Sequence, residues 1–170
     1  MKRLIAIALV MCALGLMTPA NASGAKGCIL QGSFMGVNLA GTPVFTGVYV
    51  PVTSGTGVID VSFLGFDLTL GGWFSDAVRD TGIRGTWVRT GGHTFAATGI
   101  SIVADAAGAT QYAVKLTVEY TMTDDCNQFE ASGTIGIYTP DMNPLTDEPI
   151  LEVPPGPPET AYRIVPPARH

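Results

Sequence analysis

The chain has few of the side chains that most catalytic and nucleic-acid-binding sites use. Its 170 residues include two histidines, three cysteines and nine Lys and Arg, against 14 Asp and Glu. An acidic chain with few basic residues does not attract phosphate backbones or anionic membrane surfaces. No zinc-ligand spacing, phosphate-binding loop, dinucleotide fingerprint or G-x-S-x-G nucleophile motif is present. We therefore expect no cofactor, no metal and no nucleic-acid partner.

Charge is absent from most of the N-terminal segment. Lys2 and Arg3 are followed by an apolar run over residues 4–17, and Pro19-Ala20-Asn21-Ala22 has the small-x-small pattern of a cleavage site. The run is too short for a transmembrane helix, and no stop-transfer segment follows. The sequence predicts a secretory signal peptide over residues 1–22, cleaved near Ala22. The expected product is a bacterial protein that is secreted or periplasmic and does not span the membrane.

Cysteine is scarce enough to fix the disulfide pairing. Cys12 lies within the predicted signal peptide, which leaves Cys28 and Cys126 in an exported protein. Neither has a histidine at ligand or catalytic spacing. We predict a structural disulfide between them, closing a loop of 98 residues.

Long helical periods are also missing, and short apolar stretches separated by turn signals take their place. Residues 111–123 alternate strictly between apolar and polar side chains, and the pattern resumes after Asn127, which is typical of half-buried strands. A helix of one or two turns is expected only near 75–80. The other predicted strands are residues 28–38, 44–53, 57–67, 82–90 and 93–104.

These strands have no helix to cover their apolar face, so the sheet must close on itself or fold over as a sandwich. Frequent glycine within the strands fits the sharp coiling of a small barrel. We therefore favour an all-β fold: a single antiparallel up-and-down β-barrel of about seven or eight strands, formed by residues 23–139. A sandwich is the alternative.

The composition changes after residue 139. Nine of the 12 prolines lie in residues 140–170, and Pro154-Pro155-Gly156-Pro157-Pro158 is typical of an extended polyproline-like stretch. Proline removes backbone donors from a sheet, so a central strand is not expected here. This proline-rich C-terminal extension is predicted either to wrap along the barrel or to be loosely ordered.

The polar residues do not form a recognisable catalytic set. His93 lies in a predicted hairpin turn, and Asp60 and Asp67 fall on opposite faces of an unbulged strand. What remains is a set of aromatic side chains, most of them at strand spacing, which could fill the barrel or line a cavity. The cavity candidates are Phe34, Tyr49, Phe63, Phe66, Trp73, Trp87, Phe95, Tyr112 and Tyr120.

Two short motifs carry a resemblance. Gly32-Ser33-Phe34 opens the first predicted strand, where lipocalins and related calycin barrels have G-x-W, and Gly85-Thr86-Trp87 is a second match in mid-chain. Over residues 28–139 the chain resembles small secreted bacterial β-barrel proteins of the calycin-like (lipocalin-like) or allene-oxide-cyclase-like kind. The resemblance implies a carrier of an apolar ligand. Phe34 stands where the lipocalin motif has tryptophan, and no ligand-binding residue of the lipocalins transfers to this chain.

Three hypotheses of function follow. The first is an exported, non-catalytic barrel that binds a small apolar or amphipathic molecule. The second is a structural or protein-interaction module with a solid barrel. The third is an isomerase- or cyclase-type enzyme that uses the cavity, for which Asp60, Arg84 or Glu119 could supply a polar group.

Overall fold

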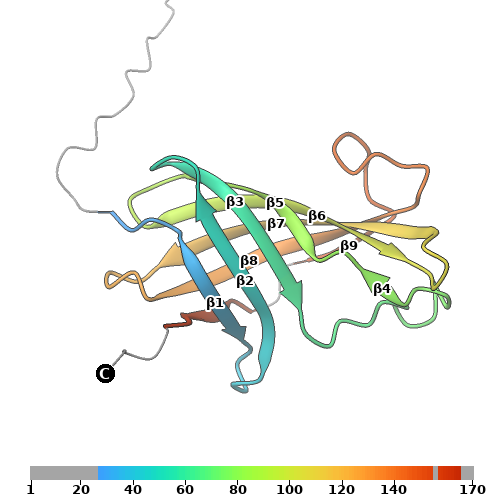
Figure 1. Cartoon of the computed structure of the whole chain (residues 1–170), viewed down its shortest axis with the longest axis horizontal. Coiled ribbons are helices and arrows are strands. Elements are labelled where there is room, and N and C mark those ends of the chain that lie inside the picture. The colour runs from blue at the N-terminus through green and yellow to red at the C-terminus, as the bar shows by residue number, and fades with distance from the viewer. Residues whose placement is uncertain (1–26, 155–156, 166–170) are drawn as a thin grey trace, which may run out of the picture.

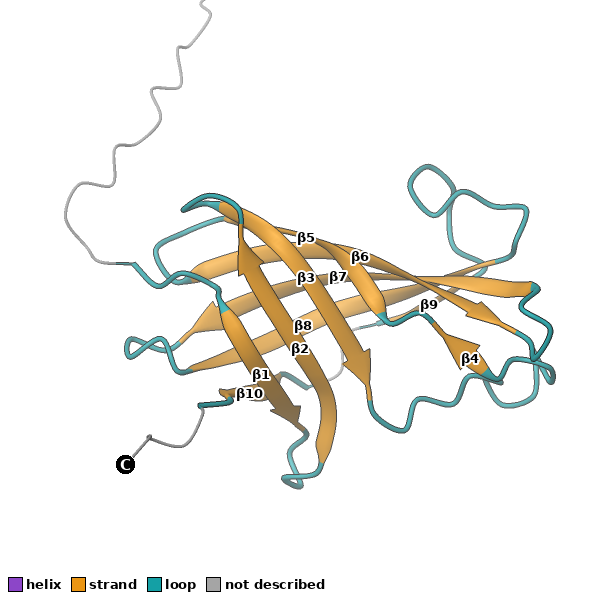
Figure 2. Ribbon diagram, viewed as in Figure 1, coloured by secondary structure: helices purple, strands orange, loops and turns teal. Residues whose placement is uncertain are grey.

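A computed structural model of the chain describes residues 27–154 and 157–165, which form strands and connecting loops (Figures 1 and 2). The predicted signal peptide lies outside the described residues. No helix occurs within them, and hence none that is long and apolar enough to cross a membrane. The strands are β1 Gly32–Val37, β2 Pro43–Pro51, β3 Thr56–Phe63, β4 Arg79–Asp80, β5 Ile83–Arg89, β6 Thr94–Ala104, β7 Thr110–Met122, β8 Gln128–Tyr138, β9 Leu151–Val153 and β10 Glu159–Arg163.

Eight of these strands close into an antiparallel ring in the order β1-β2-β3-β5-β6-β7-β8-β10, with β10 returning to β1. The short strands β4 and β9 are bonded outside the ring, to β6 and β8 respectively. The predicted all-β barrel is therefore confirmed. Its first seven ring strands lie close to the segments in which the sequence alternates.

The expected helical turn near residues 75–80 is not present, because β6 takes up the backbone groups of that segment. Val78 N–H donates to Ala104 O at 3.0 Å, and Thr81 N–H donates to Ile102 O at 3.1 Å. Arg79 and Asp80 between them form β4. An edge that offers free carbonyls binds a short extended segment more readily than that segment forms an isolated helical turn.

The ring is completed by β10, which comes from the proline-rich extension (Figure 2). It pairs with β8 on one side and with β1 on the other, for example Ala161 opposite both Phe129 and Gly36. The expectation that no central strand lies after residue 139 is therefore wrong for this segment. Glu159–Arg163 contains no proline, so each of its backbone amides can donate to the sheet.

Small residues on the inner face make room for the large ones opposite them. Gly36 faces Phe45 across the β1–β2 pair, and Gly57 faces Trp87 across β3 and β5. A Cβ on Gly36 would lie 2.0 Å from the Phe45 ring, and one on Gly57 would lie 2.4 Å from the Trp87 ring. These close approaches require glycine and let aromatic side chains fill the narrow barrel.

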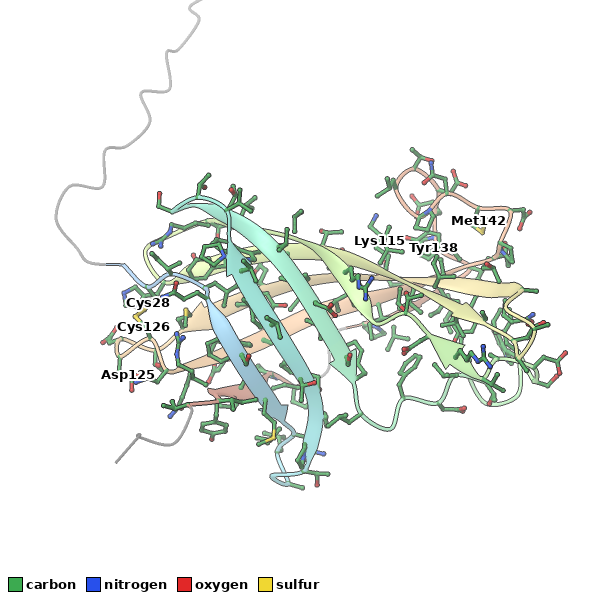
Figure 3. All side chains as sticks on the ribbon, viewed as in Figure 1. Cys28, Lys115, Asp125, Cys126, Tyr138 and Met142 are labelled. Carbon is green, nitrogen blue, oxygen red and sulfur yellow. A yellow bond between two sulfur atoms is a disulfide. The ribbon has the colours of Figure 1, made fainter. Side chains whose placement is uncertain are left out.

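One end of the barrel is covered by the segment just before β1. Cys28 and Cys126 form the predicted disulfide, with their Cα atoms 5.4 Å apart, at the end where Figure 3 shows both residues. Arg89 donates to the carbonyl of Cys28, and Arg163 donates to Gln31 O at 2.6 Å and Cys126 O at 2.7 Å. Two guanidinium groups and a disulfide thus hold this segment in place. We call this part the disulfide end.

The opposite end is covered by the long connection between β3 and β4. Phe74 from this connection packs against Tyr112, with ring centroids 4.6 Å apart, and Tyr112 Oη donates to Leu68 O at 2.7 Å. Desolvation by burial, and then the charges of Asp67 and Asp80, raise the pKa of Tyr112 to about 12. Both ends of the barrel are therefore filled by side chains.

Candidate ligand-binding cavity

A cavity of about 180 Å³ lies inside the barrel. Five of the eight ring strands contribute to it, namely β2, β3, β7, β8 and β10, together with β9 outside the ring. Most of its wall is aromatic or aliphatic. The lining residues are Phe45, Tyr49, Val61, Phe63, Leu116, Val118, Tyr120, Ala131, Ser132, Gly133, Ile135, Val153, Pro154, Pro157 and Glu159.

Strand alternation explains why these side chains meet. Leu116, Val118 and Tyr120 occupy alternate positions of β7, so all three face inward. Each is opposite a small or apolar residue of β8, with Val118 opposite Gly133 and Tyr120 opposite Ala131. Ala131 has a small side chain, so it leaves part of the interior opposite Tyr120 unfilled. At Gly133 the backbone of β7 comes close instead, because a Cβ there would lie 2.4 Å from Thr117 O.

Two tyrosine hydroxyls form the polar feature of the deep wall. Tyr49 Oη donates to Tyr120 Oη at 3.4 Å, and the rings meet edge to face with centroids 5.5 Å apart. Both side chains are almost fully buried. Burial raises the pKa of Tyr120 to about 12 and that of Tyr49 well above its usual value, so both stay neutral at physiological pH. Neutral hydroxyls can donate to or accept from a bound molecule.

The cavity extends to the side of the barrel along the edge of β8 that pairs with β9 and β10. Strand β10 pairs with Gln128–Ala131 of β8, and β9 pairs with Ile135–Ile137 on the same edge. Residues 132–134 between them have no strand partner on that edge within the described part of the chain. Pro154 and Pro157, on either side of residues 155–156 outside the described part of the chain, line the cavity at this edge. We call this edge of the cavity, lined by Ser132, Gly133, Pro154 and Pro157, the side mouth.

Glu159 supplies the only ionisable carboxylate among the lining residues, at the start of β10. Its neighbour two positions along, Ala161, is fully buried, so alternation places the Glu159 side chain on the inner face. Burial raises the pKa of its carboxyl above the ordinary glutamate value.

The structure distributes the nine predicted cavity residues among five places. Tyr49, Phe63 and Tyr120 line the cavity. Phe66, together with Phe63, lines a second space of only about 10 Å³. The remaining five are elsewhere: Phe34, Trp87 and Phe95 are packed solidly toward the disulfide end, Tyr112 is packed at the opposite end, and Trp73 is 67% exposed.

Trp73 stays outside because the connection that carries it is irregular. Residues 64–78 form turns, and the inward positions of that connection are taken by Leu68, Leu70 and Phe74, which pack against the core. Strand alternation does not extend into such a segment, so aromatic character alone does not place a side chain inside.

Sequence reasoning did not identify several of the lining residues. Phe45 and the aliphatic residues of β3, β7 and β8 follow from the same alternation that located the tyrosines. Glu159 is the most consequential omission, because the proline content of its surroundings concealed a strand. A signal was present: Glu159, Ala161 and Arg163 share one face of a five-residue run without proline.

The polar residues considered for catalysis do not line the cavity. Asp60 and Arg84 form an exposed ion pair at 3.5 Å on the outer surface, and Glu119 faces outward on β7. Asp67 instead organises a turn by accepting from Thr69 and Gly71, which lowers the pKa of its carboxyl. Within residues 27–154 and 157–165 no group of three or more His, Cys, Asp and Glu side chains could hold a metal ion.

Comparisons with protein-family models, with curated proteins and with solved structures found no match to this chain.

Proposed function

We propose that this protein is an exported, non-catalytic barrel that binds one small, largely apolar molecule in its interior. The observation that carries the proposal is the cavity of about 180 Å³, with an apolar wall, two neutral tyrosine hydroxyls and a side mouth. Ligand sites are typically apolar concavities with a few placed polar groups, and the mouth of a β-barrel is a frequent location.

The volume limits the size of the ligand. An apolar cavity of about 150 Å³ accommodates a benzene-sized molecule, whereas drug-sized ligands occupy about 300–1,000 Å³. A cavity of about 180 Å³ therefore suits a single ring with a short substituent, or a branched aliphatic chain of similar size. Long lipids and large polycyclic compounds are too big for it. This size also favours binding over the solid-barrel hypothesis, which requires a filled interior.

Export is part of the same proposal. The predicted signal peptide would deliver the chain to an oxidising compartment, and the Cys28–Cys126 disulfide is the kind of cross-link that persists there. The ring of eight antiparallel strands is also the architecture that the calycin resemblance implies. Whether the final location is the periplasm or the exterior does not affect the binding mechanism.

The first test is native mass spectrometry of the protein purified from a periplasm without detergent. We expect a mass excess under native conditions that is lost on denaturation. Soaking the protein with small aromatic compounds and measuring saturation-transfer NMR would extend the test to ligands lost during purification.

A matched pair of variants links binding to the cavity. Val118 lines the cavity and is buried, whereas Val88 faces outward on β5 and is 47% exposed. Val118→Phe should fill the space and abolish binding, and Val88→Phe should leave it unchanged. If no small molecule binds the native protein, or if Val118→Phe binds as well as the native protein does, the proposed function is wrong.

A further inference from the structure

Glu159 raises a question that an apolar ligand alone does not answer. A carboxylate on the inner face of a mostly apolar barrel loses part of its hydration, which is unfavourable unless a cation or hydrogen-bond donor compensates for it. The upward shift of its carboxyl pKa has desolvation as its cause. The question is which group compensates for this loss.

The described part of the protein offers no cation to Glu159. Arg163 shares the inner face of β10 with Glu159, but its guanidinium donates to Gln31 O and Cys126 O and lies 4.9 Å from the centre of the Phe34 ring. Within residues 27–154 and 157–165, the close contacts between a basic and an acidic side chain are Arg84 with Asp60 and His93 with Asp124. No hydrogen bond to the Glu159 carboxylate occurs within the same ranges.

The carboxylate is also in the right place for a ligand. Glu159 lines the cavity together with Pro157 and Ser132, beside the side mouth, whereas the deeper wall is formed by Phe45, Val61 and other apolar side chains. A molecule entering here would meet the negative charge at the mouth and the apolar surface farther in. This arrangement matches an amphipathic molecule with a positive end and an apolar body.

We propose that the cavity selects small organic monoamines, with the ammonium group held by the Glu159 carboxylate and a single ring or branched aliphatic body in the apolar part. This inference rests on the proposed function and adds the ligand class to it. Positive charge offsets the desolvation of Glu159, and a charge-assisted hydrogen bond is stronger than a neutral one.

The test compares two probes of equal size that differ in charge. Benzylamine is a cation at pH 7, and benzyl alcohol has the same shape but is neutral. We expect the native protein to bind benzylamine about tenfold more tightly than benzyl alcohol, measured by isothermal titration calorimetry. Raising the ionic strength should weaken the binding of benzylamine and leave that of benzyl alcohol unchanged.

Two variants with the same change in net charge complete the design. Glu159→Gln keeps the size of the side chain and should remove the tenfold preference while leaving benzyl alcohol binding within about twofold. Glu130→Gln is the control, since Glu130 lies opposite Thr160 on the outer face and is exposed. It should leave both affinities unchanged. Retained binding of benzyl alcohol shows that the Glu159→Gln variant is folded.

The outcomes separate the two proposals. If both probes bind equally well and Glu159→Gln changes neither, the monoamine inference is overturned and the proposed function stands. If neither probe binds but native mass spectrometry still detects a bound molecule, the monoamine inference is overturned and the proposed function stands; if no small molecule binds in either test, both proposals are overturned. Another outcome is that Glu130→Gln weakens the binding of benzylamine as much as Glu159→Gln does. In that case the preference comes from the overall charge of the protein rather than from the Glu159 carboxylate, and the inference is again overturned.

Discussion

Aromatic packing in this barrel depends on glycine at the opposing position. A Cβ at Gly57 would lie 2.4 Å from two atoms of the Trp87 indole and 2.4 Å from the backbone oxygen of Val50. The indole is fully buried and also packs edge to face against Phe95, so it has little room to move. The backbone oxygen cannot move aside without disturbing the β2–β3 pair.

Gly57→Ala should therefore destabilise the protein by about 1–3 kcal/mol, the usual cost of overpacking a core. Gly92→Ala is the matched control, because nothing lies within 4 Å of a Cβ at that exposed turn position. It should change the free energy of unfolding by less than about 0.5 kcal/mol. Urea unfolding measures both. Equal stabilities of the two variants would show that the Trp87 packing is looser than described.

The buried tyrosine pair makes the protein sensitive to alkali. The pKa of Tyr120 is raised to about 12 in the folded state, whereas an unfolded tyrosine ionises near its ordinary value of 10. The unfolded chain thus loses protons first as the pH rises. Stability is fully present below pH 10 and decreases between pH 10 and about 12.

Each tyrosine of this kind contributes a loss of up to about 1.4 kcal/mol per pH unit in that range. Tyr120→Phe should make the decrease shallower, although removal of its hydrogen bond with Tyr49 costs up to about 1 kcal/mol at pH 7. Chemical denaturation at pH 7, 10 and 11 gives both quantities. An unchanged slope above pH 10 in the variant would contradict the role assigned to Tyr120.

At the scale of elements, β10 decides whether the barrel is closed. It joins β8 to β1, and without it both strands would expose a free edge. It also carries Glu159 to the side mouth. The same five residues thus close the ring and place the charged group of the site.

A chain ending at residue 139 should therefore lose the cooperative fold and aggregate through the freed edges of β1 and β8. A chain ending at residue 165 retains β10 and serves as the control; its thermal midpoint should stay close to that of the full protein. Size-exclusion chromatography and thermal unfolding distinguish the two. A monomeric chain ending at residue 139 with an unchanged midpoint would show that seven strands suffice.

Strand alternation explains what could be predicted at this scale. The period-two pattern located seven ring strands and placed Tyr49, Phe63 and Tyr120 inside, since alternation depends only on local sequence. Whether an inward aromatic residue lines a cavity or fills the core depends on what faces it from another strand. Trp87 meets Gly57 and fills the core, while Tyr120 meets Ala131 and leaves space. Local sequence does not determine which residues of two different strands face each other.

At the scale of the whole molecule, the ends and the middle of the barrel have different tasks. The disulfide end is held by Cys28–Cys126 and by Arg89 and Arg163, whereas the cavity is bounded by Tyr49 and Tyr120 on the deep side and opens at the side mouth. The cysteines do not line the cavity. We therefore expect stability and ligand binding to respond separately to loss of the disulfide.

The Cys28→Ala, Cys126→Ala double variant should be less stable by about 2–4 kcal/mol, because a 98-residue loop no longer restricts the unfolded chain. The segment should stay in place in the folded state, since Leu30 is fully buried and Arg163 still donates to Gln31 O. Affinity for a cavity ligand should therefore remain within about twofold of the native value. Guanidinium unfolding and calorimetric titration measure the two quantities, and added reductant should destabilise the native protein but not the variant. If the variant loses binding while its stability is unchanged, the disulfide shapes the cavity directly and the two tasks are not separate.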